Sequence, residues 1–125
     1  MFTGAHFLFY SRSPDEDRRF LRETLGFLNV DVGDGWLIFR LPPAEIAVHP
    51  SDEGFTQAHG DHDMLGAVLY LMCNDVDAVH ATLTKKGVDL APVHQADWGR
   101  FTSMRMPSGG SIGLYQPAHQ TALDL

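Results

Sequence analysis

The sequence has one cysteine, no excess of basic residues and no long apolar run. With only Cys73, no disulfide can form within the chain, and a zinc site built from several cysteines is excluded. The formal charge of −7 argues against general nucleic-acid binding, because neutralising phosphates requires clustered Lys and Arg. No segment approaches the roughly 20 apolar residues that span a bilayer, and the N-terminus lacks the features of a secretion signal. We therefore expect a cytoplasmic protein without a nucleic-acid or membrane partner.

What is present is an ordinary globular composition, with 125 residues of which 44% are hydrophobic and 10% aromatic. A chain of this length forms one domain, which we expect to span residues 1–125. The basic residues are scattered except for Arg18, Arg19 and Arg22. These three lie among acidic residues on one predicted helix, a pattern that favours a solvated helix face.

The first half of the chain, residues 1–50, predicts a strand, a helix and three strands. The helix carries start and stop signals: Ser13 as N-cap, Pro14 at the first helical position, Glu16 to complete a capping box, and Gly26 as the stop. The sequence "GDG" between the second and third predicted strands is a hairpin signal. The strands are expected over residues 4–11, 27–32, 35–41 and 44–50.

The second half, about residues 67–118, repeats this order. A strand over 67–73 precedes a helix over 74–87, which has Asn74 or Asp75 as cap and Gly87 as stop. Three further strands are expected over 88–94, 100–106 and 111–116. The βαβββ order therefore occurs twice, and an internal repeat of this kind carries more information than any single residue.

Residues 51–66 join the two modules and are polar, acidic and glycine-containing, which predicts a connector rather than a core element. The connector contains His59 and His62 beside two aspartates. These histidines are possible replacement metal ligands, although a hydrated linker explains the composition better, because metal ligands must be held in place.

The sequence resembles the vicinal oxygen chelate superfamily, which contains glyoxalase I, bleomycin-resistance proteins and extradiol dioxygenases. The resemblance rests on "GAHFLFYS", "FLRETLGF", "NDVDAVHATLTKKGV" and "PSGGSIGLYQP", which occur in the family's order along the whole chain. It implies an α+β fold in which two βαβββ modules pair into an open, barrel-like sheet around a cleft, with the helices outside. It also implies a homodimer, because relatives generally pair.

Metal-using members of the family take ligands from the first and last strands of each module. His6 matches the ligand of the opening strand. Glu45 is the candidate for the fourth strand, and His49 lies on the same face of that strand by alternation. The first module therefore offers two or three possible donors for Fe, Ni, Zn or Mn.

The second module lacks the corresponding donors. Its first ligand position falls on Ala67 or Val68, and the last, a glutamate in the family, falls on Gly113. Because a catalytic metal needs at least three protein ligands, the resemblance together with these residues predicts a degenerate metal site and no cofactor.

Strand alternation predicts which side chains line the cleft. An aromatic and apolar lining with a few polar anchors is typical of a small-molecule site, so we expect a protein that binds a small aromatic or hydrophobic molecule without metal. The alternative is an enzyme of glyoxalase, dioxygenase or isomerase type that uses His6 with Glu45 or His49 in a partial metal site or as acid and base. The predicted ligand-binding residues are His6, Tyr10, Trp36, Arg40, Glu45, His49, Trp98, Arg100, Met104 and Tyr115.

Overall fold

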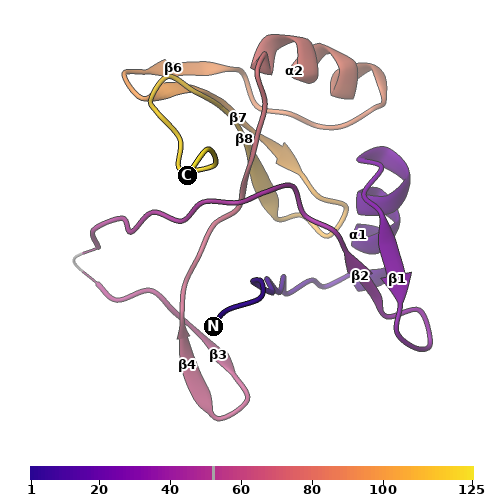
Figure 1. Ribbon diagram of the computed structural model, residues 1–125. Helices are drawn as coiled ribbons and strands as arrows, with labels where there is room; N and C mark the ends of the chain where they lie inside the picture. The colour runs from indigo at the N-terminus through magenta and orange to yellow at the C-terminus, as the bar shows by residue number, and fades with distance from the viewer. Residues whose placement is uncertain (52) are drawn as a thin grey trace. The chain divides into compact units, whose positions relative to one another are not determined.

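The computed structural model of the protein describes residues 1–51 and 53–125. Residues 1–41 and 105–111 form one compact unit, here called the N-terminal unit. Residues 42–104 and 112–125 form a second, the C-terminal unit. The architecture is α+β, as predicted, and Figure 1 shows the elements of each unit coloured along the chain.

The helix of the N-terminal unit changes its winding half-way. α1 spans Pro14–Arg19 and continues as a π-helix, η1, over Phe20–Thr24. Ser13 is the N-cap residue, as predicted, but its side chain makes no capping hydrogen bond. Gly26 has a φ of +73°, which agrees with its predicted role at the end of the helix.

A two-stranded hairpin follows this helix. β1 (Asn29–Asp31) pairs antiparallel with β2 (Leu37–Phe39), with Val30 opposite Ile38. The turn has positive φ angles from Gly33 to Gly35, as the "GDG" sequence predicts. The hairpin prediction is therefore confirmed, although both strands are shorter than expected.

The strands expected over residues 4–11 and 44–50 do not form in the structure. Both segments are rich in strand-forming residues, and Ile46 and Val48 are 93% and 94% exposed. An extended segment becomes a strand only when a neighbouring strand takes its backbone hydrogen bonds, and neither segment has such a neighbour here. The prediction of strands over residues 4–11 and 44–50 is therefore wrong.

The predicted connector contains a β-hairpin of its own. β3 (Thr56–His59) pairs antiparallel with β4 (His62–Leu65), and all eight residues are exposed. Gly60 supplies the positive φ, +62°, that the two-residue turn requires. This hairpin was not predicted from the sequence, and because it is exposed it is not a core element.

The C-terminal unit contains a strand, a helix and three strands in the order that the sequence predicts for the second module (Figure 1). β5 (Tyr70–Met72) leads into α2 (Val76–Lys85), and β5 pairs in parallel with β8 (Ser111–Pro117). β7 (Gly99–Arg105) and β6 (His94–Ala96) complete a sheet of order β5-β8-β7-β6. The strand expected over 88–94 is reduced to a single bridge between Leu90 and Met104 before β6 begins.

α2 is capped as its sequence predicts. Asp75 is the N-cap and accepts a hydrogen bond from the backbone N–H of Ala78 at 3.1 Å. Gly87, with a φ of +84°, ends the helix. Apolar side chains of α2, the loop after it and the sheet are buried in this unit: Val76, Leu83, Val88, Met104, Ile112 and Leu114.

Among the residues that the structure describes, no helix has the length and apolar character needed to cross a membrane.

Candidate functional site

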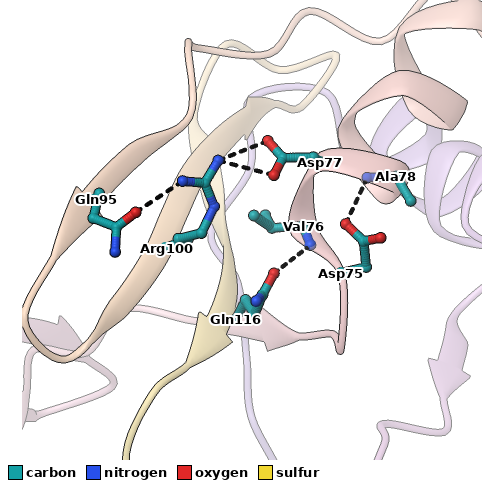
Figure 2. Close-up of polar contacts among 7 residues, drawn as sticks. All are labelled: Asp75, Val76, Asp77, Ala78, Gln95, Arg100 and Gln116. Carbon is teal, nitrogen blue, oxygen red and sulfur yellow. Dashed lines mark hydrogen bonds and ion pairs between the residues drawn. The ribbon is translucent and has the colours of Figure 1, made fainter.

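The two faces of the sheet in the C-terminal unit carry different side chains. On the side of α2, the Arg100 guanidinium contacts both carboxylate oxygens of Asp77 at 2.8 Å and Gln95 Oε1 at 2.9 Å (Figure 2). Gln116 Oε1 accepts a hydrogen bond from the backbone N–H of Val76 at 2.9 Å. Because side chains alternate along a strand, Phe101 on β7 and Tyr115 on β8 point to the opposite side. We call that opposite side the open face.

Aromatic rings gather on the open face in a continuous chain of contacts. Tyr70 meets Tyr115 edge to face, with ring centroids 5.9 Å apart, and Trp98 meets Tyr115 in the same way at 5.4 Å. Trp98 is stacked on Phe101 at 4.7 Å with an interplanar angle of 20°. Two imidazoles extend the cluster: His94 lies 5.8 Å from Phe101, and His119 lies 5.8 Å from Tyr115. We call these six side chains the aromatic face.

Two glycines make room for the tyrosine rings. Tyr70 is the cross-strand partner of Gly113, and a Cβ at Gly113 would overlap the Tyr70 ring, lying 2.8 Å even from its Cγ. At Gly99, which is buried, a Cβ would lie 2.7 Å from Cε2 of Tyr115 and overlap the carbonyl oxygen of Gln116. Glycine within a strand often marks such a close approach. Both tyrosine rings therefore depend on the absence of a side chain beneath them.

The aromatic face is accessible as well as ordered. Tyr70 is 43% exposed and Trp98 is 46% exposed. Large aromatic side chains that remain exposed next to one another mark a surface suited to binding. Their mutual contacts hold the rings in fixed orientations, so a planar molecule would meet a surface that is already arranged.

Polar groups surround the Tyr115 hydroxyl at the centre of this face. The hydroxyl donates a hydrogen bond to the carbonyl oxygen of Trp98 at 3.3 Å and also contacts Nε2 of His119. Burial raises the pKa of the Tyr115 phenol above its usual value, and the negative charge of Glu45 raises it further. Glu45 in turn accepts a hydrogen bond from the backbone N–H of Ala122 at 2.7 Å.

Comparison with solved structures finds matches over nearly the whole chain. The chain is 25% identical to TnmS3, an antibiotic binding protein from Streptomyces sp. CB03234, with a TM-score of 0.63 over 94% of this chain and 99% of that one. A lactoylglutathione lyase from Agrobacterium tumefaciens is 16% identical, with a TM-score of 0.61 over 90% of this chain and 92% of that one. The chain has the glyoxalase/bleomycin resistance protein/dioxygenase fold. This is the fold of the vicinal oxygen chelate superfamily, as the sequence resemblance implies.

A third match names this superfamily directly. A member of the glyoxalase/bleomycin resistance protein/dioxygenase superfamily from Sphaerobacter thermophilus is 22% identical, with a TM-score of 0.53 over 89% of this chain and 92% of that one. No protein-family model and no curated protein matches the sequence.

Within this glyoxalase-type fold, the predicted residues of the C-terminal unit are divided between the two sides of the sheet. Trp98 and Tyr115 belong to the aromatic face, and Glu45 acts on Tyr115 electrostatically. Arg100 contacts α2, and Met104, on the same side of β7 by alternation, is fully buried.

The remaining predicted ligand-binding residues lie away from this cluster or in the other unit. His49 is exposed, and its Nδ1 lies 2.7 Å from the carbonyl oxygen of Pro50. His6, Tyr10, Trp36 and Arg40 are exposed residues of the N-terminal unit. The Trp36 ring lies beneath the guanidinium of Arg18, whose Cζ is 5.1 Å from the ring centroid.

The candidate metal ligands come from both units. His6 belongs to the N-terminal unit, whereas Glu45 and His49 belong to the C-terminal unit. Across residues 1–51 and 53–125, the structure contains no group of three or more His, Cys, Asp or Glu side chains placed to hold a metal ion. His59 and His62 are opposite one another at the end of the exposed β3–β4 hairpin.

Four members of the cluster were not predicted from the sequence: Tyr70, His94, Phe101 and His119. The resemblance places the ligand position of the second module's first strand at Ala67 or Val68, whereas the parallel pairing of β5 with β8 places Tyr70 opposite Gly113. The glycine inside the last strand was the available signal, because a ring must approach closely where a side chain is absent. No sequence signal connected His119, in the C-terminal segment, with Tyr115.

Proposed function

We propose that the protein binds a planar aromatic small molecule on the aromatic face, without a metal ion and without making or breaking bonds. The observation that carries this proposal is the relation between Gly113 and Tyr70. At the position where the family resemblance implies a metal-binding carboxylate, this chain has no side chain, and an aromatic ring fills the space.

The energetics of aromatic contacts support this function. A stacked or edge-to-face ring pair contributes about 0.5–1.5 kcal/mol beyond the burial of its area. A planar ligand that meets Tyr70, Trp98 and Tyr115 makes several such contacts. The Tyr115 hydroxyl and the His119 imidazole contact each other beside the rings, and a ligand that exchanges one of their hydrogen bonds for its own would be fixed in orientation.

The comparison with TnmS3 supports binding rather than turnover. That protein is described as an antibiotic binding protein, and it matches 94% of this chain. The ligand class that we propose, a flat and mainly apolar molecule, follows from the rings of the aromatic face and not from that description.

We further propose that the partner of the chain is a second copy of itself. Several large apolar side chains of residues 44–68 stand in solvent, among them Ile46, Val48, Leu65 and Val68, which are 82–94% exposed. Exposed apolar surface of this extent is costly for a monomer. The chain has a mass of 13.9 kDa, and light scattering should give twice that value. A mass equal to that of one chain would rule out this assembly.

The binding proposal is tested with a Trp36→Phe variant, in which Trp98 is the one tryptophan left of the two. Planar aromatic compounds are titrated while Trp98 fluorescence and binding heat are followed. We expect saturable quenching, with the affinity lowered about two- to tenfold by Tyr70→Ala, since a lost ring contact of this kind removes about 0.5–1.5 kcal/mol. The matched control is Phe7→Ala, which removes an exposed ring of the N-terminal unit and should leave the affinity unchanged.

Two results together would refute the proposal. If no compound of the panel binds and the purified protein carries one equivalent of divalent metal, the chain is a metalloprotein rather than a metal-free binder. Turnover that depends on added Fe²⁺, Ni²⁺, Zn²⁺ or Mn²⁺ and disappears in His6→Ala would identify the enzyme alternative.

A further inference from the structure

The N-terminal unit contains an open hollow of about 280 Å³ whose lining shares no residue with the aromatic face. α1, η1 and the β1–β2 hairpin supply its lining, which contains three of the nine basic residues of the chain. The concentration is notable because the whole chain has a formal charge of −7. The lining residues, here called the arginine hollow, are Asp15, Arg18, Arg19, Arg22, Asp31, Gly35 and Leu37.

Both acidic residues of the arginine hollow are already engaged by neighbouring groups. Asp15 Oδ1 forms an ion pair with Arg18 at 2.9 Å. Asp31 Oδ1 accepts a hydrogen bond from the backbone N–H of Gly33 at 2.8 Å, inside the hairpin turn. Their charges are therefore partly compensated, and the unused hydrogen-bonding capacity of the hollow lies mainly with donors.

The donors are the guanidinium groups. Arg19 has no ion-pair partner among the described residues, and Arg22 contacts only its exposed neighbour Glu23, at 3.2 Å. Ion pairs between exposed side chains contribute little and are readily exchanged. Arg18 lies over the Trp36 ring, a contact that orients its guanidinium as well as stabilising it.

The backbone beneath these arginines has an uncommon conformation. Arg18 and Arg19 belong to α1, whereas Arg22 belongs to the π-helical turn η1, closed by the Leu25 N–H to Phe20 carbonyl bond at 3.1 Å. Short π-helical segments are rare and occur frequently at functional sites. The wider turn changes the angular position of Arg22 relative to a regular helix while all three arginines still line one hollow.

We propose that the arginine hollow binds the phosphate group of a small ligand. Guanidinium groups present planar forks of N–H donors that match phosphate oxygens, and several forks suit a tetrahedral dianion better than a carboxylate, which one fork satisfies. The volume of about 280 Å³ lies near the lower end of small-molecule sites, enough for a phosphate and a small organic group. Neither the proposed aromatic ligand nor a metal is involved.

The fluorescence of Trp36 should report binding in the arginine hollow, because the Arg18 guanidinium lies over the Trp36 ring. In a Trp98→Phe variant Trp36 is the only remaining tryptophan. Inorganic phosphate is titrated at constant ionic strength while Trp36 fluorescence and binding heat are recorded. We expect a saturable response, weakened about tenfold or more by Arg19→Gln, because glutamine cannot form the charge-assisted hydrogen bonds that a guanidinium forms with phosphate oxygens.

The matched control is Arg12→Gln, which removes one positive charge from the same unit but lies outside the lining of the hollow. Arg12→Gln should change the phosphate affinity less than twofold. The affinity measured by binding heat should likewise agree within twofold between the wild-type protein and the Trp98→Phe variant. An equal loss in Arg12→Gln and Arg19→Gln would show general charge attraction and overturn the proposal. Acetate binding as tightly as phosphate would overturn the phosphate assignment, and a titration with neither heat nor fluorescence change would overturn the site itself.

Discussion

The ring of Tyr70 on β5 lies across Gly113 on the neighbouring parallel strand β8. The contact joins two positions that are 43 residues apart in sequence, and it explains why the last strand tolerates a glycine in its interior. A glycine normally weakens a strand, because it contributes no side chain to packing. Here that loss is offset by an aromatic ring that could not otherwise reach the sheet.

Gly113→Ala should displace the Tyr70 ring. The added Cβ would overlap the ring, and relieving such overlap in a packed site costs about 1–3 kcal/mol. We expect a lower free energy of unfolding in denaturant titrations and weaker binding of aromatic compounds. Gly110→Ala is the control, because a Cβ at Gly110 meets nothing within 4 Å. Equal stability of the two variants would contradict the close contact between Tyr70 and Gly113.

Gln116→Ala should destabilise the start of α2. It removes the acceptor for the N–H of Val76, a fully buried residue, and an unsatisfied buried donor costs about 1–3 kcal/mol (Figure 2). The measurement is urea unfolding followed by circular dichroism. The control is Gln57→Ala on the exposed β3–β4 hairpin. It should change the free energy of unfolding by at most about 0.5 kcal/mol, as is usual for surface sites. If Gln116→Ala leaves the free energy of unfolding unchanged, water accepts the hydrogen bond of the Val76 N–H in place of the glutamine.

The Tyr115 phenol should ionise at a higher pH than an ordinary tyrosine, because burial and the charge of Glu45 both raise its pKa. A raised folded-state pKa means that the unfolded chain loses the proton first. The contribution to stability is therefore complete below pH 10.0 and is lost as pH rises from there through the folded-state pKa. Ultraviolet difference spectra of wild type against Tyr115→Phe should show the delayed ionisation.

Glu45→Gln should lower the pKa of Tyr115 towards its usual value. Glutamine removes the negative charge but keeps an oxygen that can accept the hydrogen bond from Ala122. Glu16→Gln, on the exposed first turn of α1, should leave the phenol titration unchanged. If Glu45→Gln leaves the titration where it was, burial alone accounts for the shift.

The Cys73 thiol should react slowly with disulfide reagents near pH 8. Burial raises its pKa above the ordinary value of 9.0. Backbone hydrogen bonds at Asp75 and Tyr115 lower the pKa by less, and the charge of Asp75 raises it. The rate of thiol modification should rise with pH through a midpoint above 9.0 in the folded protein. In denaturant the midpoint should fall to that of a free cysteine. A midpoint below 9.0 would require a positive group near the sulfur.

The second module could be predicted closely from the sequence, because its signals are local. Asp75 and Gly87 mark the ends of α2 through capping and a positive φ, both of which depend on neighbouring residues alone. The alternation of β7 and β8 likewise grouped Arg100 with Met104 and Gly113 with Tyr115. Which group faces α2 could not be read from either strand, because it depends on where the helix packs.

The first module shows the opposite case. Residues 4–11 and 44–50 have the composition of strands, yet strand formation needs a paired neighbour, and no local pattern supplies one. The hairpin of residues 56–65 was missed for a related reason: its residues are polar and exposed, and its pairing follows from the turn at Gly60.

The amino-acid sequence alone determines the α+β class and the caps and period of α2. It also determines that the second module has no side-chain donors at its expected ligand positions. Each of these properties depends on residue type and local spacing. Tertiary structure decided that Tyr70 fills the space above Gly113, that Arg100 faces α2, and that His119 reaches Tyr115. Those relations arise when strands distant in sequence are paired, and the side chain opposite a given residue is set only by that pairing.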